Sequence, residues 1–322
     1  MQEILKKTLS IVIPVFNEEK NISALYKSLL LEISKLEIFN YEIVFVNDGS
    51  TDHSLEEIKI ISQNDSKVKY IDFSRNFGQQ VALSAGIDYA KGDYIILMDA
   101  DFQDPPELIP ELVSLAEEGN DVVYAKRKSR KGESFLKKLT AKIFYRFLNL
   151  ITNCKIPLDT GDFRIISRKV ADILKQMPEQ QKFLRGQIAW IGFRQKMIEY
   201  DRPVRTKGRS NYSYGKMMKF AIDGITSFSD FPLKFATFLG FFVSIIAFIL
   251  MLWALYQRLI VKEYVQGWTS LILSVLFIGG IQLISIGIIG EYISRIAGNI
   301  RKRPLYIVNE TNCEENKDED KK

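Results

Sequence analysis

The chain has 322 residues, a net charge of +5 at pH 7, one histidine and two cysteines. A single histidine argues against zinc sites and catalytic triads built on imidazole, and two distant cysteines argue against a disulfide framework. The length allows one large domain or two ordinary ones.

Two long stretches towards the C-terminal end, residues 235–257 and 264–290, contain no charged residue. Each is long enough to cross a hydrocarbon core of about 30 Å as a helix. Lysines and arginines cluster before the first stretch and after the second, and only Arg258, Lys262 and Glu263 carry charge between them. The positive-inside bias therefore predicts a multi-pass protein of the cell membrane whose termini are both cytoplasmic.

The basic excess beside the apolar stretches favours an anionic membrane surface over nucleic acid as the partner. Residues 1–13 lack the apolar region and cleavage site of a signal peptide, so we expect the domain that precedes the apolar stretches not to be exported. The predicted segments are a cytoplasmic domain at 1–212, a juxtamembrane amphipathic segment at 213–232, transmembrane helices at 233–257 and 264–290, and a cytoplasmic tail at 291–322.

Short β-branched runs alternate with helical patterns before the apolar stretches. The predicted strands are residues 9–15, 41–46, 68–73, 94–98 and 121–124, with helices at 22–36, 55–61 and 81–89, then helices at 170–177 and 183–189 and a strand at 194–200. This alternation predicts an α/β fold with a mostly parallel sheet and helices on both of its faces. No G-x-G-x-x-G follows the first strand, which argues against a dinucleotide oxidoreductase.

Polar residues follow the first two predicted strands. Asn17 and Glu19 either contact a base or ribose, or belong to an ordinary helix N-terminus. Asp48 precedes Gly49, which permits a sharp turn, and points into the crevice where α/β sheets bind ligands. The alternative for Asp48 is a turn residue.

The acidic stretch Asp99-Ala100-Asp101-Phe102-Gln103 follows the fourth, fully apolar strand. If the chain stays extended, its first, third and fifth residues share one side and can offer oxygens to one hard cation. Mg²⁺ or Mn²⁺ held in this way completes its shell with water and substrate phosphates, which implies a nucleotide diphosphate. The alternative is a capped turn, in which Asp104 caps a helix opened by Pro105 and Pro106.

Later segments add basic and acidic features. A basic run at 126–131 and a basic amphipathic helix at 135–148 fit a surface that meets anionic lipid. Asp162 is a candidate catalytic carboxylate. The basic, glycine-containing loop at 201–212 can close over a diphosphate, and residues 214–230 are expected to lie along the membrane interface.

Together these motifs resemble the family 2 glycosyltransferases of GT-A fold, and more narrowly the polyprenyl-phosphate glycosyltransferases, which include dolichyl-phosphate mannose synthase and bacterial enzymes that load undecaprenyl phosphate. The resemblance covers residues 8 to about 308 and rests on the order of Ile13-Pro14-Val15-Phe16-Asn17-Glu18-Glu19, Asn47-Asp48-Gly49-Ser50, Ser74-Arg75-Asn76-Phe77-Gly78, Asp99-Ala100-Asp101-Phe102-Gln103, Asp162-Phe163-Arg164 and Arg303-Pro304-Leu305-Tyr306.

The resemblance implies a catalytic domain at 1–212 and assigns roles to single residues. Asp162 would be the base, Asp101 a further catalytic residue, and Arg127 the group that holds the acceptor phosphate. The metal trio would be Asp99, Asp101 and Gln103. The nucleotide sugar would contact Pro14, Phe16, Glu18, Glu19, Asp48 and Asp99, and the flexible loop residues Arg202, Arg205, Arg209, Ser210 and Tyr212. Phe16 stands where the family often has tyrosine.

The expected reaction is the inverting, metal-dependent transfer of one sugar, glucose or another hexose or N-acetylhexosamine, from a nucleotide diphosphate to undecaprenyl phosphate. UDP is expected, and GDP stays open. The cation, Mg²⁺ or Mn²⁺, would neutralise the departing diphosphate. A phosphate acceptor is mostly anionic at neutral pH, so Asp162 orients it rather than acting as a strong base. The resemblance also implies a homo-oligomer such as a tetramer, for which Gly280 and Gly287 offer a small-residue face.

Two other functions compete with this one. A processive polysaccharide synthase needs a channel, for which two spans are too few, and its Q-x-x-R-W motif is incomplete because Gly186 follows Arg185. A catalytically inactive membrane adaptor would have no need to keep the acidic trio.

Overall fold

The computed structural model describes residues 6–36, 39–127, 160–200, 229–256, 260 and 267–314. The chain forms two compact units, which are described separately. The sheet unit comprises Met1–Asn149, Cys154–Met217 and Arg303–Lys322, and the helical unit comprises Leu150–Asn153 and Met218–Lys302.

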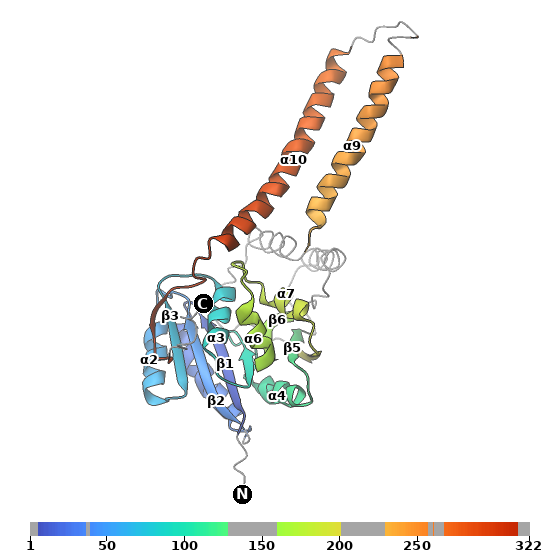
Figure 1. Cartoon of the computed structure of the whole chain (residues 1–322). Helices are drawn as coiled ribbons and strands as arrows, with labels where there is room; N and C mark the ends of the chain where they lie inside the picture. The colour runs from blue at the N-terminus through green and yellow to red at the C-terminus, as the bar shows by residue number, and fades with distance from the viewer. Residues whose placement is uncertain are drawn as a thin grey trace. The chain divides into compact units, whose positions relative to one another are not determined.

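The sheet unit is built on eight described strands in the order β7-β5-β6-β4-β1-β2-β3-β8 (Figure 1). They are β1 (Thr8–Val15), β2 (Asn40–Asn47), β3 (Val68–Phe73), β4 (Tyr94–Leu97), β5 (Val122–Arg127), β6 (Thr160–Ser167), β7 (Gln195–Tyr200) and β8 (Val308–Thr311). Strand β1 pairs in parallel with β2 and β4, β2 with β3, and β5 with β7. Only β6 and β8 run antiparallel to their described neighbours, so the predicted mostly parallel sheet is confirmed.

Helices cover both faces of this sheet, as the apolar strand runs predict. The helices are α1 (Glu19–Ile33), α2 (Ser54–Asn64), α3 (Gln79–Tyr89), the 3₁₀ turn η1 (Pro106–Leu108), α4 (Ile109–Glu117), α6 (Arg168–Gln176) and α7 (Leu184–Ile191). One core cluster takes side chains from α1, α2 and α4, and the other from α3, α6 and α7. Gly86 lets α3 lie close to β1, because a Cβ there would come 2.1 Å from Val12 Cγ1.

The C-terminal segment returns to the sheet as β8, which the sequence pattern does not predict. Its strand pairs with the edge strand β3. Tyr306 stacks on Phe73 with ring centroids 5.1 Å apart, and its hydroxyl donates to Asp88. Asn309 Nδ2 donates to the buried carboxylate of Asp72 at 2.8 Å. This segment therefore covers the sheet edge that β3 would otherwise expose.

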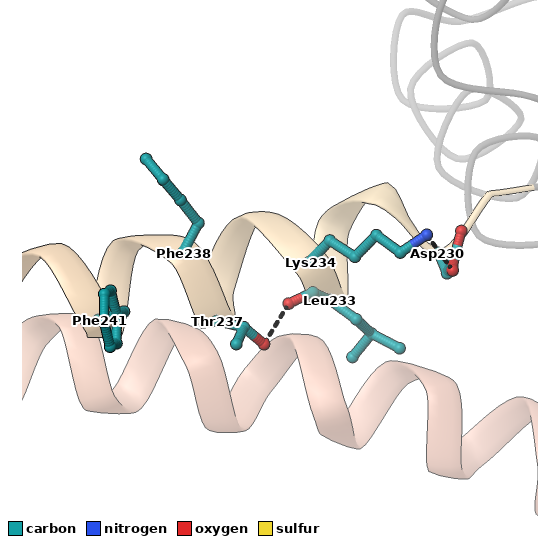
Figure 2. Close-up of a pocket in the computed structure, with 6 residues that line it drawn as sticks. All are labelled: Asp230, Leu233, Lys234, Thr237, Phe238 and Phe241. Atoms are coloured by element: carbon teal, nitrogen blue, oxygen red, sulfur yellow. Dashed lines mark hydrogen bonds and ion pairs between the residues drawn. The ribbon is translucent and has the colours of Figure 1, made fainter.

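The helical unit contains two helices long and apolar enough to span a membrane, α9 (Phe231–Tyr256) and α10 (Trp268–Ile300). Helix α10 continues past the predicted end of the span at residue 290, where Arg295 pairs with Glu291 one turn earlier. A hollow of about 540 Å³ lies along the first turns of α9. Lys234 and Asp230, which line it, form an ion pair at 2.8 Å, and the apolar Phe238 and Phe241 line it further along the helix (Figure 2). After Lys234, no residue of α9 carries a charge.

Candidate functional site

The carboxyl ends of β1, β2 and β4 meet at one edge of the sheet, because these strands are parallel neighbours. Asp48 follows β2 and Asp99 lies just beyond β4. Strand β6 runs the other way, with Arg164 opposite Leu97, so Asp162 near its start lies at the same edge. The fold therefore brings together the acidic residues that the sequence marks as candidates.

The loops after β1 and β2 are tied to each other by main-chain donors. Asn17, with φ of 58°, donates its amide to Ser50 Oγ at 3.0 Å and accepts from the amide of Thr51 at 2.8 Å. The amide of Glu19 donates to Asp52 at 3.2 Å, and a Glu19 carboxylate oxygen accepts from the amide of His53. The polar side chains of Asn17 and Glu19 thus organise these loops.

Other predicted contacts to the nucleotide sugar lie at the end of β1 and in the loop that follows it. Phe16 is 45 % exposed, which leaves its ring open for stacking, whereas Pro14 is half-buried. Glu18 accepts from Asn21 in the first turn of α1, and its amide donates to Ser54 Oγ at 2.9 Å. The loop therefore combines an exposed ring with a fixed backbone.

Asp48 is buried and anchors the segment between β3 and α3. Its carboxylate accepts from the amides of Phe77 at 2.6 Å and Gly78 at 2.9 Å. Burial raises the pKa of Asp48, and these two amides limit the rise. These contacts fix the start of α3, and the predicted contact of Asp48 with the nucleotide sugar stays a prediction.

The chain turns at the acidic stretch instead of staying extended. Phe102 has φ of 58°, a region rarely used by residues with a Cβ, and Asp101 Oδ1 accepts from the amide of Gln103 at 3.0 Å. Asp104 does not cap the following helix; its buried carboxylate accepts from the amide of Asp99 at 3.0 Å and from the Tyr200 hydroxyl. Proline does open that helix, at Pro106 in η1.

Asp99 carries the most perturbed carboxylate of this edge among the groups described. Burial, and then the negative charge of Asp104 and Asp162, raise the pKa of Asp99 well above its usual range. Its Oδ1 accepts from Gln79 Nε2 at 2.6 Å. The part of this rise that comes from crowded negative charge is one that a cation would relieve. No three carboxylate, thiol or imidazole groups of the described residues form a metal site, but the expected trio has only two carboxylates and an amide.

Asp162, 5 % exposed, is paired with a guanidinium. Arg185 Nε lies 2.8 Å from Oδ1 and Nη2 lies 3.2 Å from Oδ2, and Gln80 Nε2 also donates to Oδ2 at 3.0 Å. Burial alone would raise the pKa of Asp162, but the charge and hydrogen bonds of Arg185 hold that pKa below its usual range. Asp162 is therefore ionised at neutral pH and is a weak base.

Sequence reasoning did not identify Gln79, Gln80 or Arg185 as site residues. The two glutamines follow the motif that ends at Gly78, and Arg185 belongs to the incomplete Q-x-x-R-W pattern. Their positions beside these motifs could have marked them as candidate site residues. Their hydrogen-bond partners, however, are about 20 to 100 residues away in the chain.

Several predicted site residues lie outside the described residues: Arg202, Arg205, Arg209, Ser210 and Tyr212. The predicted amphipathic helix at 135–148, residues 213–228 of the juxtamembrane segment at 213–232, and residues 315–322 of the tail at 291–322 do so as well. Arg127 is described only by its backbone, which ends β5 opposite Tyr200.

The mixed sheet of eight described strands, with ligand-side carboxylates at the ends of its parallel strands, is GT-A-like and defines a glycosyltransferase fold. Residues 10–174 match the model of the family described as Glycosyl transferase family 2. The chain belongs to this family and is a glycosyltransferase, so the family resemblance read from the motifs is confirmed.

Similar proteins match over almost the whole chain. The uncharacterized glycosyltransferase YkcC of Bacillus subtilis is 49% identical over 96% of this chain and 95% of its own. The SfII prophage-derived bactoprenol glucosyl transferase of Shigella flexneri is 43% identical over 93% of this chain and 97% of its own. Among solved structures, glucosyl-3-phosphoglycerate synthase from Mycobacterium tuberculosis, in complex with Mn²⁺, uridine-diphosphate-glucose and phosphoglyceric acid, is 20% identical with a TM-score of 0.47, covering 69% of this chain and 79% of that chain.

Proposed function

We propose that the protein transfers a single hexose-type sugar, with inversion, from a UDP-sugar to undecaprenyl phosphate at the cytoplasmic face of the cell membrane. The observation that carries this proposal is the match to a bactoprenol glucosyl transferase over 93% of this chain and 97% of that protein. The match extends beyond the sheet unit, and two helices of this chain can span a membrane. A lipid-linked acceptor explains why a sugar transferase would carry such helices.

The acidic edge fits a hard divalent cation, Mg²⁺ or Mn²⁺. Burial, and then crowded negative charge, raise the pKa of Asp99, and carboxylate and amide oxygens are the donors such cations prefer. The residues that would hold it are Asp99, Asp101 and Gln103. When bound, the cation would neutralise the charge of the departing nucleotide diphosphate.

Asp162 acts in this proposal by orienting the acceptor. Its two oxygens accept hydrogen bonds from Arg185 and Gln80, and its lowered pKa makes it a poor proton acceptor. A phosphate monoester has a second pKa near 6 and needs little deprotonation at neutral pH. The attacking phosphate oxygen therefore needs to be placed, and Arg127 is the residue proposed to hold its headgroup.

The decisive experiment incubates the purified full chain with undecaprenyl phosphate and a panel of sugar nucleotides, followed by mass spectrometry of the lipid extract. We expect a product carrying one sugar, formed from a UDP-sugar and lost on addition of EDTA. Lipid carrying several sugars would instead indicate a processive synthase, and no turnover of any donor would indicate an inactive adaptor.

Two variants assign the roles within this reaction. Asp101→Ala should abolish EDTA-sensitive transfer without unfolding the protein, while Asp172→Ala, on the exposed side of α6, should leave transfer unchanged. Arg127→Ala should weaken the use of polyprenyl phosphate much more than the binding of sugar nucleotide. Equal loss of both substrates would contradict the role of Arg127.

A further inference from the structure

Gln80, the second residue of α3, uses both ends of its side-chain amide. Its Nε2 donates to Asp162 Oδ2 at 3.0 Å, and its Oε1 accepts from the backbone amide of Leu184 at 3.1 Å. A carboxylate only accepts and a backbone amide only donates, so a single orientation of the glutamine satisfies both partners. Gln80 is therefore matched to its two neighbours in a way that neither leucine nor glutamate reproduces.

Both partners of Gln80 belong to the same small assembly. Leu184 opens α7, where the first amides of a helix lack partners within the helix. The next residue, Arg185, binds the same carboxylate through two nitrogens. Helix α3, strand β6 and helix α7 thus converge on Asp162, and Gln80 hydrogen-bonds both Asp162 and the backbone at the start of α7.

We propose that Gln80 is a positioning residue for sugar transfer. It fixes the rotation of the Asp162 carboxylate and holds the start of α7 so that Arg185 meets that carboxylate with both nitrogens. The inference rests on the part of the proposed function in which Asp162 orients the attacking group. It assigns to Gln80 no contact with either substrate.

This role depends on the orientation of the Asp162 carboxylate. With Arg185 alone, the carboxylate and guanidinium can rotate together, because both are joined to the backbone through flexible side chains. A second donor from a different element removes that freedom. The lone pairs left over on Asp162 then point in one fixed direction, which is what an orienting group needs if it is to place an acceptor oxygen within reach of the sugar.

Gln80→Glu separates the two hydrogen bonds. The variant keeps an oxygen that can accept from the amide of Leu184, but when ionised it has no donor for Asp162. We expect transfer to fall roughly 10–100-fold at neutral pH, the loss of one hydrogen bond to a charged group, with the KM for the sugar nucleotide and the melting temperature close to those of the wild type. At mildly acidic pH the glutamic acid can donate again, so the deficit relative to wild type should shrink.

The second variant and the controls remove the remaining ambiguity. Gln80→Leu loses both bonds and should show the same loss of kcat without recovery at acidic pH. Gln63→Glu and Gln63→Leu, at an exposed position of α2, make the same chemical changes away from the site and should leave kcat and its pH profile unchanged.

Hydrolysis of the sugar nucleotide by water is measured in the same samples. If the wild type hydrolyses the donor but does not use polyprenyl phosphate, the proposed acceptor is wrong, and the hydrolysis rates of the variants still test Gln80. Wild-type rates for Gln80→Glu across the pH range would overturn the positioning role. So would losses that follow only a lower melting temperature or a higher donor KM, because these would show a merely structural residue. A wild type without either activity would overturn both proposals.

Discussion

Arg185 binds Asp162 through two parallel contacts, Nε to Oδ1 at 2.8 Å and Nη2 to Oδ2 at 3.2 Å. The carboxylate is buried, whereas the arginine side chain is 23% exposed. A buried carboxylate that keeps its charge needs such a partner, since an unpaired charge in the interior is costly. The pair therefore keeps Asp162 ionised at the edge where the substrates are expected to meet.

Arg185→Lys should lower transfer about tenfold or more, because a lysine keeps the charge but cannot make two parallel hydrogen bonds. Arg185→Leu should also destabilise the protein, by up to about 3 kcal/mol, since it leaves the buried carboxylate with only the more distant Arg164, at 3.9 Å, as a described cationic partner. Steady-state kinetics and thermal unfolding in detergent measure the two effects. Arg194→Lys, at an exposed position before β7, is the matched control; equal behaviour of the two lysine variants would contradict this role.

Asp52 should make the stability of the sheet unit depend on pH in the acidic range. Burial would raise its pKa, but hydrogen bonds from Ser54 and from the amide of Glu19 outweigh it and lower the pKa of Asp52. A lowered folded-state pKa contributes stability that is present above the unfolded value of about 3.9 and is lost as pH falls through the folded value. Asp52→Asn should therefore cost about 1 kcal/mol at neutral pH and much less near pH 3.

Thermal unfolding of both proteins at neutral and acidic pH measures this difference. Asp172→Asn serves as the control, because its exposed carboxylate has only a 3.7 Å ion pair with Arg168. A cost for Asp52→Asn that is the same at both pH values would show that the ionised carboxylate contributes nothing.

The C-terminal strand should be required for the stability of the sheet unit. Asp72 is buried, and its two oxygens accept from Asn47 Nδ2 at 2.7 Å and Asn309 Nδ2 at 2.8 Å. Asn309→Leu removes one of these donors and should cost about 1–3 kcal/mol, measured by thermal unfolding. Asn64→Leu, at an exposed position at the end of α2, should cost less than half as much. Equal losses of stability in the two variants would mean that this contact of β8 does not stabilise the sheet unit.

Much of the fold could be predicted because its signals are local. Runs such as Ile11-Val12-Ile13 are buried on both faces of a parallel sheet and so read as continuous apolar strands. Acidic residues just after parallel runs had to gather at one edge, and Asp48 and Asp99 do. Asp162 joins them from near the start of β6, because that strand runs antiparallel to β4. Strand β8 escaped prediction because Val308-Asn309-Glu310-Thr311 is short and polar and is defined by its partners on β3.

The contacts between side chains of the site could not be predicted from spacing alone. The prediction that the side chains of Asp99, Asp101 and Gln103 share one face assumed an extended chain. The chain instead forms a turn, in which the Asp104 carboxylate accepts a hydrogen bond from the amide of Asp99. That bond depends on Asp104 being buried against Tyr200, which is far away in the sequence. In the same way, Gln80 and Arg185 become site residues only when α3 and α7 pack beside β6.

Gly280 and Gly287 of α10 should hold copies of the chain together. A Cβ added at either glycine would meet no atom of the described residues within 4 Å, so the described packing leaves room at this face for a neighbouring helix. They lie two helical turns apart on one face, where small residues let helices approach closely in a membrane. We therefore expect a homo-oligomer in nanodiscs, which the double variant Gly280→Leu, Gly287→Leu converts to a smaller species with its catalytic unit still folded.

Gly279→Leu, at the same depth but on another face and equally unobstructed, should leave the assembly intact. Native mass spectrometry or mass photometry reads the result: a monomeric wild type, or equal disruption by the control, would show that this glycine face does not join protomers.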